Sequence, residues 1–141
     1  MARIKLELPE IFLFSTEITV RITDLNYGGH LGNADTLVLI HEARVRFLRS
    51  FGYSETDVEG YGTIMIDAVI QFKSQAFAGD VLVIEVAAAD FSRLGCDFYY
   101  RLTNKETGAV VATAKTGVAV FDYANQKRVS PPVAFVRKLQ G

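Results

Sequence analysis

The pattern of apolar and polar side chains predicts a protein made mostly of β-strands. Residues 18–22 alternate apolar and polar, which is the period of two that a half-buried strand shows. Four later stretches rich in Val, Ile, Phe and Tyr are also predicted to be strands, at residues 62–74, 80–90, 95–104 and 109–123. Only short turn-forming segments separate the last three, so we expect neighbouring strands to be antiparallel.

One long helix is predicted between the first strand and the second. Leu37, Ile40, Phe47 and Phe51 recur at helical spacing after Asn33, which we expect to be the N-cap, and Gly52 is a natural stop. Asp35 in the first turn suits the helix dipole. Residues 130–141 are predicted to form a short surface segment or a final helical turn. One helix that must bury its apolar stripe against an antiparallel sheet predicts an α+β fold.

Composition narrows the class of protein. The 141 residues are enough for one domain, 1–141, with half of them apolar. The net charge is −1 and Lys and Arg are scattered, so the sequence contains no basic patch that would indicate nucleic-acid binding. No apolar run approaches the ~20 residues of a membrane span, and charges and Pro9 interrupt any signal-like core, so a cytoplasmic protein is expected. Cys96 is the only cysteine, which excludes an internal disulfide.

Candidate chemistry gathers in the loop before the helix, TDLNYGGHLGN at residues 23–33. Together with HEARVRFL (41–48), GDVLVIEV (79–86), TGVAVFD (116–122) and SPP (130–132), this loop resembles the hotdog-fold thioesterases of the 4-hydroxybenzoyl-CoA thioesterase type. The resemblance covers nearly the whole chain. It implies an antiparallel sheet of five to six strands wrapped around one long central helix, in a homodimer or homotetramer with sites between subunits.

The resemblance also implies a reaction, the hydrolysis of an acyl-CoA thioester to a carboxylic acid and free CoA, with no cofactor. A backbone N–H at the helix start would polarise the thioester carbonyl, and the N–H of Asn33 is the closest match by position. Unpaired N–H groups and a positive dipole end at a helix N-terminus suit a developing oxyanion. Gly29 and its neighbouring glycines would let the backbone approach the acyl group.

The family's usual catalytic carboxylate is replaced here by Asn26. An amide cannot accept a proton near neutral pH, but it can position water or the thioester. His30 could act as the base, or could tie the loop down through a backbone hydrogen bond. Asp24 could accept a proton, or could cap the turn through its side chain.

Three further side chains are candidates for the missing base. Glu42 and His41 lie near the depth at which another branch of hotdog thioesterases carries a helix carboxylate. Glu42 could instead form a solvated pair with Arg46, and His41 could be a packing histidine. Asp67 interrupts an apolar strand, and alternation groups it with Met65, so it is either exposed or buried with a raised pKa.

Two other functions stay open. Asp24 and His30 echo a D-x-N-P-x-H motif of hotdog hydratases, although His30 comes one residue late. A non-catalytic acyl-CoA-binding protein is the other alternative, given Asn26.

No metal is expected, because the candidate ligands Asp24, His30, Asp35 and His41 lack any spacing typical of metal ligands. Basic residues that could contact CoA phosphates are scattered and receive no assignment: Lys73, Arg93, Lys127 and Arg128.

Overall fold

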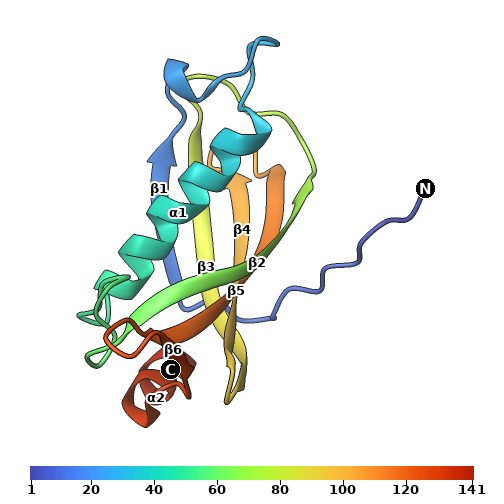
Figure 1. Ribbon diagram of the computed structural model, residues 1–141. Helices are drawn as coiled ribbons and strands as arrows, with labels where there is room; N and C mark the ends of the chain where they lie inside the picture. Colours follow the sequence, from blue (N-terminus) through green and yellow to red (C-terminus); the bar gives the residue numbers. More distant parts are fainter.

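A computed structural model describes residues 1–141 and contains one antiparallel sheet of six strands, two helices and a short 3-10 turn (Figure 1). The strands are β1 (Phe14–Thr19), β2 (Gly62–Phe72), β3 (Val81–Ser92), β4 (Gly95–Asn104), β5 (Val110–Asp122) and β6 (Lys127–Val129). The helices are α1 (Asn33–Arg49) and α2 (Val133–Gln140), and the 3-10 turn is η1 (Ile22–Asp24). The strand order β1-β3-β4-β5-β2, with β6 on β5, confirms the predicted α+β fold.

The long helix α1 lies across one face of the curved sheet and packs on β1 and β3 (Figure 1). Its buried face includes Ile40, Ala43, Phe47 and Leu48. The ring of Phe47 meets that of Phe98 edge to face, with centroids 5.3 Å apart. Since burying one large apolar side chain contributes ~1.5–3 kcal/mol, this seam holds α1 in place against the sheet. Neither helix is both long and apolar enough to cross a membrane.

The start of α1 differs from the sequence prediction in one residue. Gly32, not Asn33, is the N-cap, with φ −74° and ψ 157° and no side chain capping the helix. Thr36 N donates the first helical bond to Gly32 O at 2.9 Å, and Thr36 Oγ1 donates to the same oxygen at 2.8 Å. The backbone N–H groups of residues 33–35 therefore have no partner within the chain.

Two other boundaries are corrected. The first strand covers Phe14–Thr19 rather than 18–22. Its pairing with β3 ends at Thr19, and the chain turns into η1 at Ile22. At the end of the chain, α2 is longer than the final helical turn that was predicted. Its Phe135 and Leu139 are buried, so α2 contributes to the core instead of lying on the surface.

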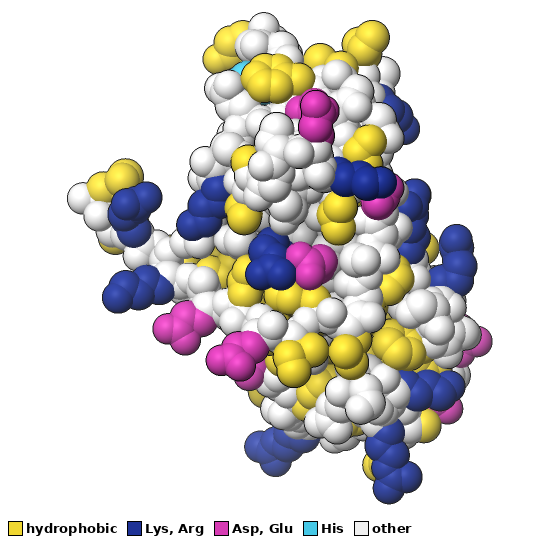
Figure 2. Space-filling view, turned by 180° about the vertical axis from the view of Figure 1, so that it is seen from behind, with side chains coloured by type: hydrophobic (Ala, Val, Ile, Leu, Met, Phe, Trp, Pro, Cys, Tyr) yellow, Lys and Arg dark blue, Asp and Glu magenta, His cyan; other side chains and the backbone are white.

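A β-bulge in β2 decides which way its side chains point. The register shifts between Met65, which pairs with Val118, and Asp67, which pairs with Gly117. Ile66 is the extra residue, so the faces of Met65 and Asp67 are opposite. The prediction that Asp67 shares a face with Met65 is therefore wrong. Met65 faces α1, whereas Asp67 lies on the outer face of the sheet, the side shown in Figure 2.

Candidate functional site

The loop before α1 is shaped by its own hydrogen bonds. Asn26 N donates to His30 O at 2.9 Å, and Gly29, with φ +81°, donates its N–H to Asn26 O at 3.0 Å. The side-chain oxygen Oδ1 of Asn26 accepts the N–H of Gly28 at 2.9 Å. Asn26 thus forms an Asx-type turn, which gives its side chain a role in the conformation of the loop.

Asp24 is buried, and its hydrogen bonds hold the start of the loop in place. Its carboxylate accepts hydrogen bonds from the Arg21 backbone N–H at 2.8 Å and from the Arg21 guanidinium at 3.0 Å. The hydrogen bond from Arg21 holds the pKa of Asp24 below its ordinary value, although burial acts in the opposite direction. Of the two roles open for Asp24, the structure shows the capping role.

A hollow of about 230 Å³ lies at the start of α1, and we call it the first hollow. Its wall is formed by the helix start and by the chain after β2: His30, Asn33, Thr36, Phe72, Lys73 and Ser74. His30 Nδ1 is 3.4 Å from Leu31 O, a long contact that leaves the ring only loosely held. The first hollow therefore brings His30 together with Asn33, the first of the three residues at the helix start whose N–H groups are unpaired.

A second hollow of about 210 Å³ lies further along the same side of α1. It is lined by Leu37, Val38, Ile40, His41, Arg44, Met65 and Thr116. Both hollows open between α1 and strands β2 and β5, and we call them together the α1–β2 groove. One end of the groove contains the backbone donor of Asn33, and the other end contains the ionisable side chains of His41 and Arg44.

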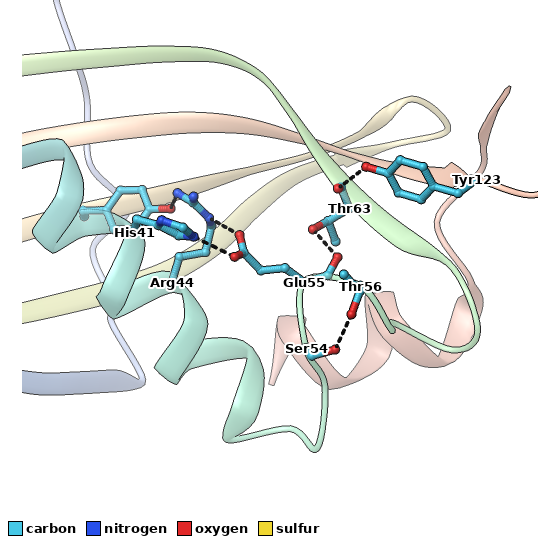
Figure 3. A network of polar contacts seen from close by, with 8 residues as sticks. His41, Arg44, Ser54, Glu55, Thr56, Thr63 and Tyr123 are labelled. Carbon is cyan, nitrogen blue, oxygen red and sulfur yellow. Dashed lines mark hydrogen bonds and ion pairs between the residues drawn. The ribbon is translucent and has the colours of Figure 1, made fainter. Parts of the chain in front are cut away.

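The second hollow carries a polar network that reaches from α1 to the loop before β2 (Figure 3). His41 Nε2 lies 2.6 Å from Glu55 Oε1, and Arg44 Nε donates to Glu55 Oε2 at 3.4 Å. Arg44 also donates to the hydroxyl of Tyr100 at 3.4 Å, and that hydroxyl lies 2.8 Å from Thr116 Oγ1. Burial alone would raise the pKa of Glu55, but its contacts with His41 and Arg44 bring the pKa below the ordinary value.

The remaining predicted site residues lie away from the groove. Glu42 forms the predicted pair with Arg46 at 3.6 Å, with its side chain half exposed. Asp67 accepts the Gly117 N–H at 2.8 Å and pairs with Lys115 at 2.9 Å on the outer face. The structure therefore places neither carboxylate beside the helix start.

Sequence reasoning missed Glu55 and Arg44. Glu55 comes from a loop fourteen residues after His41, and no spacing rule links the two. Arg44 stands on the apolar side of α1 with only 9% of its side chain exposed, although the motif around it gave no reason to expect a buried arginine. The one available signal was that Arg44 lies four residues after Ile40, on the predicted apolar stripe.

The rest of the structure offers neither a second catalytic cavity nor a metal site. A larger cavity of about 470 Å³ lies at the other end of α1, with Phe14, Phe47, Phe51 and Leu139 in its wall. Lys138 is its only charged side chain, so the cavity lacks groups for acid–base chemistry. No three His, Cys, Asp or Glu side chains come together in a way that could hold a metal ion.

Comparisons with known proteins place the chain in a family. A family model described as the thioesterase-like superfamily matches residues 20–139. No curated protein matches the chain in sequence.

Several solved structures share the fold. Slr0204, a 1,4-dihydroxy-2-naphthoyl-CoA thioesterase from Synechocystis, is 21% identical with a TM-score of 0.80 over 90% of this chain and 94% of its own. YbaW, a probable thioesterase from Escherichia coli, is 24% identical with a TM-score of 0.78 over 89% and 96%. SAV2348 from Staphylococcus aureus, solved in complex with CoA, is 18% identical with a TM-score of 0.80 over 96% and 90%. The family match spans most of the chain and these structures have the same architecture, so this protein belongs to the hotdog-fold thioesterase-like superfamily.

Proposed function

We propose that this protein hydrolyses acyl-CoA thioesters in the α1–β2 groove. The observation that carries the proposal is the set of unpaired N–H groups of residues 33–35 beside the first hollow. Donors fixed at a helix start stabilise the oxyanion that forms when water attacks a thioester carbonyl, and they need no rearrangement during the reaction. The loss of one such donor typically costs ~10²–10³-fold in rate.

The groove also suits the rest of the substrate. Phe72 and Val111 line the first hollow, and Leu37, Ile40 and Met65 line the second, which gives an acyl group an apolar wall. Lys73 lines the first hollow, and it is the only one of the four scattered basic residues left unassigned from the sequence that lies there. The CoA bound to SAV2348 and the CoA thioester named for Slr0204 support the same substrate class.

The same groove supports a homodimer. β2 is an edge strand of the five-strand path and leaves apolar side chains uncovered: Ile64, Met65, Ile66 and Phe72. Leu37 and Val38 of α1 are also exposed beside it. A second copy that pairs with β2 would cover this surface and close the groove, as the resemblance implies for the family.

Hydrolysis is favoured over hydration by the position of Asp24. A hydratase of this kind would need the carboxylate of Asp24 beside His30, but the carboxylate is buried against Arg21. With that carboxylate engaged, the loop offers no second acid for adding water across a double bond.

The test is release of CoA by the purified protein over a panel of short, medium, long and aromatic acyl-CoAs, with products identified by mass. We expect free CoA and the carboxylic acid in equal amounts. A hydroxyacyl-CoA as product would instead establish the hydratase. Saturable binding without turnover across the whole panel would establish the non-catalytic alternative.

A further inference from the structure

We propose that His41 and Glu55 form the proton-transfer pair of the hydrolysis. The thioester on which they act is held by the α1 start of a second copy, in the arrangement between subunits that the resemblance implies. This inference rests on the proposed function and adds the groups that activate water. In this inference His41, oriented by the carboxylate of Glu55, takes the role of the carboxylate that the resemblance implies at the position of Asn26.

The pair is built more firmly than any other candidate base. His41 Nε2 and Glu55 Oε1 are 2.6 Å apart, a short contact even for a hydrogen bond to a charged carboxylate. The backbone oxygen of Glu55 accepts both the N–H and the hydroxyl of Thr63 at 2.8 Å, which fixes the loop (Figure 3). Arg44, nearly buried, holds the second carboxylate oxygen. By contrast, His30 has no carboxylate partner.

This geometry leaves one ring nitrogen for chemistry. With the Nε2 proton directed at Glu55, the neutral ring carries its lone pair on Nδ1, which has no hydrogen-bond partner in the chain. Nδ1 would take a proton from water while the water oxygen bonds to the carbonyl carbon, and Glu55 would stabilise the imidazolium. When the C–S bond breaks, the same proton passes from Nδ1 to the departing CoA sulfur, which restores the neutral ring.

One chain cannot supply both ends of the site. Asn33 and His41 are eight residues apart in α1, which is about 12 Å along the helix axis. The N–H would hold the carbonyl oxygen and His41 would reach the carbonyl carbon through one water, with contacts of about 3 Å each. The two groups would therefore have to lie within about 10 Å of each other, which is less than their separation along one helix.

A two-fold axis near the middle of α1 resolves this separation. Residue 37 lies halfway between 33 and 41, and Leu37 and Val38 are the exposed apolar side chains of α1. Two antiparallel α1 helices related by an axis at Leu37 would place His41 of one copy opposite the helix start of the other. The partner copy thereby completes each site.

The first experiment measures kcat and KM on the best substrate of the panel. We expect His41→Ala to lower kcat by about 10²-fold or more, with partial recovery on addition of imidazole. We expect Glu55→Gln to lower kcat at least about tenfold with KM nearly unchanged.

Controls separate this role from a structural one. Glu85→Gln breaks a comparable pair with Arg101, 2.8 Å apart, and should leave kcat unchanged. Full activity of His41→Ala, or an unchanged kcat in Glu55→Gln, would overturn the inference while leaving hydrolysis by the parent intact. An inactive parent would instead remove the proposed function itself.

The second experiment tests the action across two copies. Asn33→Pro removes one backbone donor, and His41→Ala removes the base. If each site uses both copies, mixing and re-equilibrating the two inactive variants in equal amounts should restore about one quarter of the parent activity, from the hybrid dimers with one intact site. No recovery from hybrids shown to have formed would contradict the shared site.

Discussion

Single side chains fix the loop that presents the helix start, and Asp24 contributes most among them. We expect Asp24→Asn to lower the free energy of unfolding by about 1 kcal/mol at neutral pH, because it weakens the part-buried hydrogen bonds that the charged carboxylate accepts from the Arg21 backbone N–H and from the largely exposed Arg21 guanidinium. Chemical denaturation at several pH values checks this. The folded-state pKa of Asp24 is lowered, so its contribution is complete above about pH 4 and is lost as the pH falls through the folded pKa. The variant should lack that acid-side loss, and equal acid sensitivity in parent and variant would contradict it.

The single thiol gives a second prediction at this scale. Cys96 is buried, and burial raises the pKa of its thiol to about 12. We expect a thiol-reactive dye to label the native protein slowly and the denatured protein fully, at one site per chain. Labelling is followed by absorbance with and without denaturant. Rapid labelling of the native protein would show that the β4 region opens readily, and a Cys96→Ser variant serves as the control.

Individual residues show what the sequence could and could not predict about the site. The Glu42–Arg46 pair follows from i, i+4 spacing, and the capping role of Asp24 follows from the local chemistry of Asp, so both were expected as alternatives. The contact of His41 with Glu55 depends on the path of a loop, which no periodic pattern encodes. Local interactions were therefore accessible from the sequence, whereas the polar network was not.

At the scale of elements, the bulge in β2 makes a separate prediction. Asp67 replaces a ladder hydrogen bond by accepting the Gly117 N–H. Asp67→Ala should lower the free energy of unfolding by about 1 kcal/mol and leave kcat and KM unchanged, because the side chain faces away from the groove. Urea denaturation and CoA release measure the two effects. A large fall in kcat at unchanged stability would restore Asp67 as a candidate base.

The elements themselves were largely predictable, for identifiable reasons. Runs of Val, Ile, Phe and Tyr between turn residues located β2 to β5, and the 3.6-residue period located α1. The bulge escaped prediction because Ile66 continues an apolar run, so nothing in the sequence marks the extra residue. The extent of α2 escaped because its stability comes from burying Phe135 and Leu139 in the core.

At the scale of the whole molecule, the exposed edge of β2 predicts an oligomer. We expect the parent to sediment as a dimer or a larger even assembly, and Ile66→Lys to shift it toward monomer because the charge would be buried at the pairing edge. Sedimentation velocity measures the change, and circular dichroism confirms that the variant folds. Leu94→Lys, a matched change at an exposed leucine in the turn before β4, should leave the assembly unchanged. A parent that is monomeric at micromolar concentration would contradict the shared groove.

The whole fold explains how one architecture is kept at low sequence identity. Slr0204 shares the fold with a TM-score of 0.80 at 21% identity, which means that the apolar pattern of sheet and helix persists while individual side chains change. We expect the catalytic side chains to belong to the part that changes, because Asn26 stands where the resemblance implies a carboxylate. The backbone donors at the α1 start depend on the fold alone, and they are the feature we expect to share with such relatives.

The central claim is that backbone N–H groups at the start of α1 hold the thioester oxygen, and one pair of variants tests it directly. Asn33 is the first residue of α1, where proline is tolerated, and the extended φ and ψ of Gly32 suit a residue before proline. Asn33→Pro removes the N–H, whereas Asn33→Ala removes only the side chain. We predict that kcat for CoA release falls about 10²-fold in Asn33→Pro and changes little in Asn33→Ala, with both variants folded. Equal kcat in the two variants would contradict the account.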